Sequence, residues 1–103
     1  MKYFCDIDGT ICTTVADGDY GKAIPFMNRI HYLNKLFDQG HEIHYWTARG
    51  SSSGKDWAKV TEGQLNWWGC KYTTLKLGKP SYDVWIDDKA WYSEDFFMAH
   101  DAR

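Results

Sequence analysis

The sequence predicts an α/β fold, a Rossmann-like three-layer domain with a small, mostly parallel sheet of about four strands. Short apolar runs of strand type alternate with amphipathic helical segments along the chain. A strand–helix–strand order of this kind is typical of a parallel sheet with right-handed crossovers. The chain has 103 residues, of which 44% are hydrophobic and 25% are charged. That size suits one globular domain and is too small for two, so we expect a single domain over residues 1–103.

Four short segments are expected to form the strands. They are rich in aromatic and β-branched residues and are bounded by polar residues or glycine. Their ranges are 2–7, 41–47, 71–77 and 82–86. Between the first strand and the first helix, residues 8–22 are rich in Gly, Asp and Thr, which is typical of turns or a small hairpin.

Three segments are expected to form helices. In the first, about 26–37, apolar residues recur at positions i, i+4, i+7 and i+11, and Gly40 follows as a helix stop. The second runs from about 55 to 68. The third lies near 93–100, with Ser93 as the expected N-cap.

The charge balance argues against a nucleic-acid or membrane partner. Twelve Lys and Arg residues face 14 Asp and Glu residues, for a formal net charge of −2, so there is no strong counterion-release drive. No apolar run reaches the roughly 18–20 residues needed to span a bilayer, and the acid at Asp6 precedes any signal-peptide apolar region. The three cysteines are an odd number without CxxC spacing, which favours a reducing compartment. We therefore expect a cytoplasmic protein.

Three of the predicted strands end in or next to polar residues. The first ends at Asp6 and Asp8, the second at Thr47, and the fourth at Asp87 and Asp88. In parallel sheets the functional crevice lies at the carboxyl ends of the strands. Three separate pieces of sequence are therefore expected to deliver polar groups to one edge of the sheet.

Several ionised carboxylates that meet at one edge repel one another and need a cation. Oxygen ligands suit Mg²⁺, which takes few carboxylates, several waters and a substrate phosphate. A carboxylate in such a site can attack phosphorus to give an aspartyl-phosphate, while a neighbouring carboxyl group handles the proton of the leaving oxygen. Gly9 would let backbone amides approach the phosphate closely.

Each of these features also has an ordinary structural interpretation. Residues 6–10 could be a turn capped by Asp, Thr47 an ordinary β-former, and Lys79 a surface charge. Acidic residues such as Asp87 and Asp88 are common where a strand leads into a loop. Their joint order and placement are what these interpretations leave unexplained, and they favour a functional site.

Over almost its whole length the chain resembles phosphatases of the haloacid dehalogenase superfamily. The first motif of that family, DxDGT, matches residues 6–10, and its second, a Ser or Thr after the second strand, matches Thr47 in YWTARG. The third motif, a Lys ahead of the last core strand, matches Lys79 in GKP. The fourth, an acidic pair after an apolar strand, matches Asp87 and Asp88 in VWIDD.

The resemblance implies a role for each matching residue. Asp6 would be the nucleophile and a Mg²⁺ ligand, and Asp8 the general acid and base that also gives the metal its backbone carbonyl. Thr47 would donate a hydrogen bond to the transferring phosphoryl group. Lys79 would offset the charge of Asp6 and of the phosphoryl oxygens. Asp87 would be a metal carboxylate, and Asp88 would act through water or beside the metal.

Substrate contacts are expected from the residues next to these motifs. Arg49 lies two positions after Thr47 and could grip a phosphate bidentately, or it could be an exposed loop charge. We place Gly9, Thr10, Ala48 and Arg49 among the residues that would contact the substrate.

The short spacing between motifs implies a member of the family without a cap domain, because only about 38 residues separate Asp8 from Thr47. A site without its own lid needs another means to exclude water. A second copy of the chain is one such means, and the six Trp and seven Tyr residues suit an oligomer interface.

The sequence therefore predicts a Mg²⁺-dependent phosphomonoester hydrolase that acts on a small phosphorylated metabolite, such as a sugar or polyol phosphate. A nucleic-acid 3′-phosphatase is an alternative, although the acidic balance and the lack of a basic patch speak against it. A phosphoacceptor signalling module is another, but the third strand ends at Lys76-Leu77-Gly78 without an acceptor Asp. A catalytically silent binding subunit is the last alternative.

Overall fold

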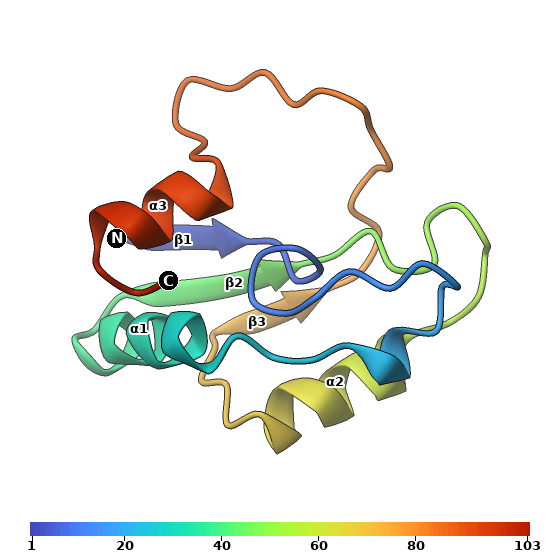
Figure 1. The fold of residues 1–103 in the computed structure, drawn as a ribbon, viewed down its shortest axis with the longest axis horizontal. Helices are drawn as coiled ribbons and strands as arrows, with labels where there is room; N and C mark the ends of the chain where they lie inside the picture. The colour runs from blue at the N-terminus through green and yellow to red at the C-terminus, as the bar shows by residue number, and fades with distance from the viewer.

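The computed structural model describes all 103 residues and is built on a three-stranded parallel sheet. The strands are β1 (Lys2–Cys5), β2 (Glu42–Trp46) and β3 (Thr74–Lys76), paired in the order β1-β2-β3 (Figure 1). The α/β class and the parallel sheet are thus confirmed. All three strands point the same way, so their carboxyl ends meet at one edge of the sheet.

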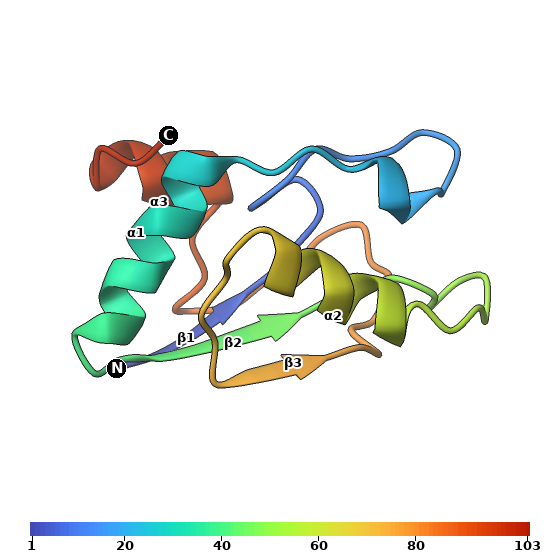
Figure 2. The ribbon, with the colours of Figure 1, turned by 90° about the horizontal axis from the view of Figure 1, so that it is seen from below.

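Three α-helices and one 3-10 turn complete the fold. They are η1 (Tyr20–Lys22), α1 (Met27–Asp38), α2 (Ala58–Trp67) and α3 (Ser93–Ala99). All three α-helices lie on the same side of the sheet (Figure 2). The sheet and its helices therefore form two layers, and the expectation of three layers is wrong for this structure.

Buried and partly exposed side chains alternate along β2, and this pattern shows which side of the sheet faces the core. Ile43 and Tyr45 are fully buried, and they point to the side covered by the helices, where Ile30, Leu33 and Leu65 belong to the same apolar cluster. His44 points the other way, because successive side chains in a strand alternate between faces. It stacks on Phe4, with ring centroids 4.7 Å apart, and Phe4 remains 65% exposed.

The helix predictions hold with small shifts at the ends. α1 lies within one residue of the predicted range, and Gly40 follows it with φ 95°. α2 begins later than expected because the Ala58 amide donates to the Asp56 carboxylate at 2.9 Å, just ahead of the first turn. Ser93 is the first residue of α3 rather than its N-cap, and its hydroxyl donates to the Gly9 carbonyl at 3.3 Å.

Residues 82–86 do not form the fourth strand in this structure. After β3 the chain turns at Gly78, which has φ 86°, and Pro80 then lacks an amide to donate. The segment from there to α3 swings out beyond the β1 edge of the sheet (Figure 1). Val84 and Ile86 are 75% and 93% exposed, and β1 pairs on one edge alone, with β2.

None of the helices combines the length and the apolar character that a membrane crossing requires.

Candidate functional site

One cleft gathers residues that follow the carboxyl ends of β1 and β2. Its volume is about 360 Å³. Six of the lining side chains carry hydroxyl groups, two are carboxylates, and one is a guanidinium. The lining residues are Asp6, Asp8, Thr14, Val15, Tyr20, Thr47, Ala48, Arg49, Gly50, Ser52, Ser53 and Ser81. Asp6, Asp8, Thr47, Ala48 and Arg49 among the predicted site residues therefore share one cavity.

Asp6 directly follows β1 and keeps one carboxylate oxygen available to the cleft. Oδ1 accepts the backbone amide of Ile7 at 2.9 Å, and Oδ2 lies 3.7 Å from Lys79 Nζ. Burial raises the pKa of Asp6 above its ordinary value; the ammonium of Lys79 and the Ile7 amide act against this shift, and the charge of Asp8 adds to it. The carboxylate is thus held where its negative charge is not fully compensated.

Lys79 approaches the site from the turn after β3. Its backbone amide donates to the Thr47 carbonyl at 3.1 Å, which ties the turn to the end of β2. The ammonium lies 5.1 Å from the ring centroid of Tyr82 and 5.7 Å from that of Trp85. Its side chain is 12% exposed, so the Lys79 charge is partly desolvated beside Asp6 and acts on it more strongly than a surface lysine would.

Thr47 follows β2 and is almost fully buried in the cleft wall. Its amide donates to the Lys76 carbonyl at 3.0 Å, and its Oγ1 accepts the Arg49 amide at 3.1 Å. The hydroxyl hydrogen of Thr47 is therefore left to donate toward the cleft.

Asp8 forms a bidentate ion pair with Arg49. Arg49 Nε donates to Asp8 Oδ2 and Nη2 to Oδ1, both at 2.9 Å. The other donors of the guanidinium are also occupied: Nη1 bonds to Thr61 Oγ1 at 3.1 Å and to Gln64 Oε1, and Nη2 lies 3.9 Å from Cys12 Sγ. The Arg49 side chain has no exposed surface.

This pairing contradicts the expectation that Arg49 grips a substrate phosphate. A guanidinium has five N–H donors, and in Arg49 each of them already points to an acceptor within the protein. The prediction that Arg49 lies beside the cleft is confirmed, but its anionic partner is Asp8 and not a substrate phosphate. An arginine two residues after a strand end can turn toward an anion of the protein or toward a bound one, and the sequence does not distinguish the two.

Gly9 and Thr10 do not line the cleft. The Gly9 amide donates to the Cys12 carbonyl at 2.9 Å and the Thr10 amide to the Ile7 carbonyl at 3.0 Å. The tight turn that Gly9 makes possible, with φ 78°, uses these amides for its own hydrogen bonds. The expected amide cradle for a phosphate is therefore not formed by these two residues.

Asp87 and Asp88 lie in the exposed segment between β3 and α3, apart from the residues that line the cleft. The Asp87 carboxylate accepts the Lys89 amide at 2.8 Å and the Trp85 indole N–H at 3.4 Å. The structure forms no cluster of three or more acidic, His or Cys side chains suited to a metal ion. The predicted convergence of three strand ends thus takes place for the first and second strands, with Lys79 added from the third.

Sequence reasoning missed the residues that support the cleft from outside the motifs. Tyr20, in η1, lines the cleft and its ring lies 4.7 Å from the Arg49 guanidinium. Gln64 on α2 bonds to Arg49 and also to the Tyr20 carbonyl. The one available signal was the helical spacing of Thr61 and Gln64, which places both on one face of α2.

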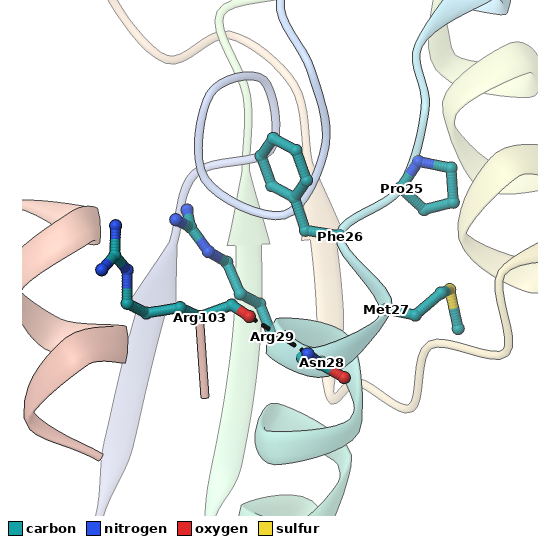
Figure 3. Close-up of a pocket in the computed structure, with 6 residues that line it drawn as sticks. All are labelled: Pro25, Phe26, Met27, Asn28, Arg29 and Arg103. Atoms are coloured by element: carbon teal, nitrogen blue, oxygen red, sulfur yellow. Dashed lines mark hydrogen bonds between the residues drawn. The ribbon is translucent and has the colours of Figure 1, made fainter. Parts of the chain in front are cut away.

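A second hollow, of about 320 Å³, lies at the start of α1 (Figure 3). Arg29 lines it, but this guanidinium donates to the Thr10 carbonyl at 3.0 Å and to Glu94 at 3.1 Å. The side-chain Nδ2 of Asn28 donates to the backbone oxygen of Arg103 at 3.2 Å, which ties Arg103 to α1. The polar groups of this hollow hold the C-terminal segment against the first helix.

Two solved structures share the fold of this chain. No protein-family model matches the chain, and curated proteins give no match. An MCSG target from Vibrio cholerae superimposes with a TM-score of 0.82 at 24% identity, over 92% of this chain and 85% of that one. A chain in a Pnkp1/Rnl/Hen1 complex superimposes with a TM-score of 0.61 at 18% identity, over 94% of this chain and 33% of that chain. At these identities the likeness shows a shared fold, which in the second case is about a third of a longer chain.

Proposed function

We propose that this protein is a Mg²⁺-dependent phosphomonoester hydrolase of the haloacid dehalogenase type, working through an aspartyl-phosphate on Asp6. One observation carries the proposal. Asp6, Asp8 and Thr47 line a single cleft, and Lys79 contacts Asp6 from the third strand end. This set supplies a nucleophile, a second carboxyl group, a neutral donor and a cation, which are the parts that phosphoryl transfer needs for positioning and charge stabilisation.

The roles follow from the positions of the side chains. A free Asp6 oxygen would attack phosphorus, so that a bond forms between Asp6 and phosphorus while the bond to the leaving oxygen breaks. Asp8, on the same cleft wall, would pass a proton to the leaving alcohol and later take one from the water that hydrolyses the intermediate. Thr47 would donate to a phosphoryl oxygen, and Lys79 would stabilise the negative charge.

The donor set of the cleft fits Mg²⁺, because this ion needs few protein carboxylates and keeps several waters beside a substrate phosphate. Asp6 would hold it through its carboxylate and Asp8 through its backbone carbonyl, because both carboxylate oxygens of Asp8 accept hydrogen bonds from Arg49. A bound Mg²⁺ would neutralise charge on the phosphate oxygens and orient the ester toward Asp6.

Asp87 and Asp88 belong to the proposed metal site through a fourth strand. We place residues 82–86 on the open edge of β1, where a parallel strand would carry Asp87 toward the carboxyl end of β1 and Asp6. Two observations support this. Residues 80–91 take part in no backbone–backbone hydrogen bond, and the outer edge of β1 has no partner strand. Addition of a strand would pair the free backbone N–H and C=O groups of this segment with those on the outer edge of β1.

Hydrogen exchange tests this strand. We expect Mg²⁺ together with orthovanadate, a phosphate mimic, to slow amide exchange in residues 83–87 by about tenfold or more, because pairing with β1 protects strand amides. Asp87→Asn is the matched variant and should remove the ion-dependent protection. Unchanged exchange in the wild type with both additions present would contradict the fourth strand.

The substrate is proposed to be a small phosphorylated metabolite such as a sugar or polyol phosphate. Hydroxyl groups of Thr14, Tyr20, Ser52, Ser53 and Ser81 surround the cleft beyond the acids. Such groups suit hydrogen bonding to a polyhydroxylated leaving group. Arg49 is the single Lys or Arg among the residues that line the cleft, and its guanidinium is paired with Asp8. The cleft therefore has no free cation to bind a second phosphate group of a substrate.

Phosphate release from a panel of esters tests the proposed activity. We expect the purified chain to release phosphate from an aryl phosphate and from sugar or polyol phosphates with Mg²⁺, and to lose this activity in EDTA. Adding back Mg²⁺ should restore it, which separates metal removal from damage. Full turnover in EDTA would contradict the metal requirement. A strong preference for 3′-phosphorylated oligonucleotides would favour the nucleic-acid phosphatase instead, and no release from any ester would leave a binding role.

A further inference from the structure

We infer that Arg49 is a positioning residue that acts through Asp8, rather than a substrate-binding residue; this inference rests on the proposed function. The structure joins the two side chains by a bidentate pair at 2.9 Å on both arms. Asp8 keeps 20% of its side chain exposed while that of Arg49 has none. The aspartate therefore faces the cleft, and the arginine holds it from behind.

The geometry of the guanidinium fixes the orientation of the carboxylate. Two parallel N–H···O bonds place the carboxylate in the plane of the fork, which a single contact does not do. The fork is itself held, because Thr61 and Gln64 on α2 accept from Nη1. Asp8 is thus aligned by a helix that contributes no residue to the lining of the cleft.

The same network reaches the loop that forms the other wall of the cleft. Gln64 donates to the Tyr20 carbonyl through its amide nitrogen, and the Tyr20 ring lies 4.7 Å from the Arg49 guanidinium. Asp8, Arg49, Gln64 and Tyr20 therefore form one connected unit. A change at Arg49 is expected to disturb the proton-transferring carboxylate and to leave the phosphate contacts of Thr47 and Lys79 in place.

Arg49→Lys separates the two roles. Lysine keeps the charge but presents a compact ammonium without the fork. If Arg49 positions Asp8, kcat should fall by about 10- to 100-fold, since misaligned acid–base catalysis loses part of its rate advantage, while KM and inhibition by inorganic phosphate change by less than about threefold. If Arg49 instead binds the substrate phosphate, KM and the inhibition constant should rise by tenfold or more, and that result would overturn the inference.

Arg29→Lys is the matched control. Arg29 is also a buried arginine, bonded to Glu94 and the Thr10 carbonyl and stacked on Phe26 and Phe97. Its loss should lower the thermal midpoint at least as much as Arg49→Lys, yet leave kcat within about threefold of the wild type. A similar kcat loss in both variants would show that Arg49 acts through general stability, which would overturn the positioning role.

A double-mutant cycle with Asp8→Asn completes the test. Because Arg49 acts through Asp8, Arg49→Lys should lower kcat by less than about threefold in the Asp8→Asn background. Full additivity of the two losses would contradict the inference. The thermal midpoints of the same four proteins test the pair without any turnover, and should deviate from additivity by roughly 3 °C or more.

The two measurements separate the possible failures. A wild type that releases no phosphate from any ester overturns the proposed function and the catalytic role of Arg49 with it. In that case non-additive thermal midpoints would still confirm the ion pair. Additive midpoints in an active enzyme would overturn the inference alone.

Discussion

Replacing Asp6 with Asn is expected to abolish phosphate release, with kcat lower than that of the wild type by more than about 10³-fold. The amide oxygen of asparagine is a poor nucleophile and carries no negative charge to hold a cation. Steady-state release from an aryl phosphate in saturating Mg²⁺ measures the loss. Asp38→Asn is the control, because Asp38 is an exposed acid paired with Lys71 on the surface and its replacement should leave kcat unchanged.

The same variant should fold at least as stably as the wild type at neutral pH. Burial raises the pKa of Asp6, so the folded state disfavours the ionised form. Below the ordinary pKa of an aspartate, the carboxyl group is protonated in both the folded and the unfolded state, and burial of Asp6 costs no stability through its charge. Above the raised pKa of the folded state, the full destabilisation by the ionised carboxylate is present. The thermal midpoint of Asp6→Asn should therefore equal or exceed that of the wild type at pH 7, and the difference should shrink as the pH falls toward 4. In the turnover assay described above, a kcat of Asp6→Asn near the wild-type value would contradict the nucleophile role of Asp6.

Asp8→Asn is expected to cause the second largest loss, about 10²- to 10⁴-fold in kcat for an alkyl phosphate. An alkoxide is a poor leaving group and needs a proton, which asparagine does not supply. Nitrophenolate can leave without a proton, so transfer of the phosphoryl group to Asp6 should be much less affected with a nitrophenyl phosphate. Rapid-quench measurements with the two esters separate the steps.

The leaving-group dependence is what distinguishes a proton-transfer role from a binding role for Asp8. The nitrophenyl ester should give a burst of nitrophenol, because the slow step becomes hydrolysis of the intermediate, which also needs Asp8. Equal losses on both esters with no burst would contradict that role.

The sequence was sufficient to predict that polar residues at the ends of β1 and β2 lie in one cleft. Enrichment in aromatic and β-branched residues predicted β2, and the helical spacing of apolar residues predicted α1. Once the sheet is parallel, the ends of β1 and β2 lie side by side, and Asp6 and Thr47 meet without further information. This part of the site follows from local pattern and topology.

The structure of residues 82–86 could not be predicted in the same way. The apolar run predicts a strand, but a strand also needs a partner that satisfies its backbone groups. In this structure the edge of β1 stays open, and Val84 and Ile86 remain exposed. Pairing of distant segments is a tertiary property that a five-residue pattern does not determine.

The hydrogen-bond partners of the site residues also could not be predicted from the sequence. Gly9 suggested amides free for a phosphate, yet its turn uses those amides internally. Arg49 suggested an anion-binding arginine, yet its anion is Asp8. Residue type restricts which chemistry a side chain can supply, and packing decides which partner receives it.

The most direct test of the account is to locate the phosphoryl group on the protein. Asp8→Asn, incubated with Mg²⁺ and a nitrophenyl phosphate, quenched in acid and mapped by mass spectrometry, should carry one phosphoryl group on the peptide that contains Asp6, and Asp6→Asn should carry none. A phosphoryl group on any other residue, or turnover without a phosphorylated protein, would contradict the aspartyl-phosphate route.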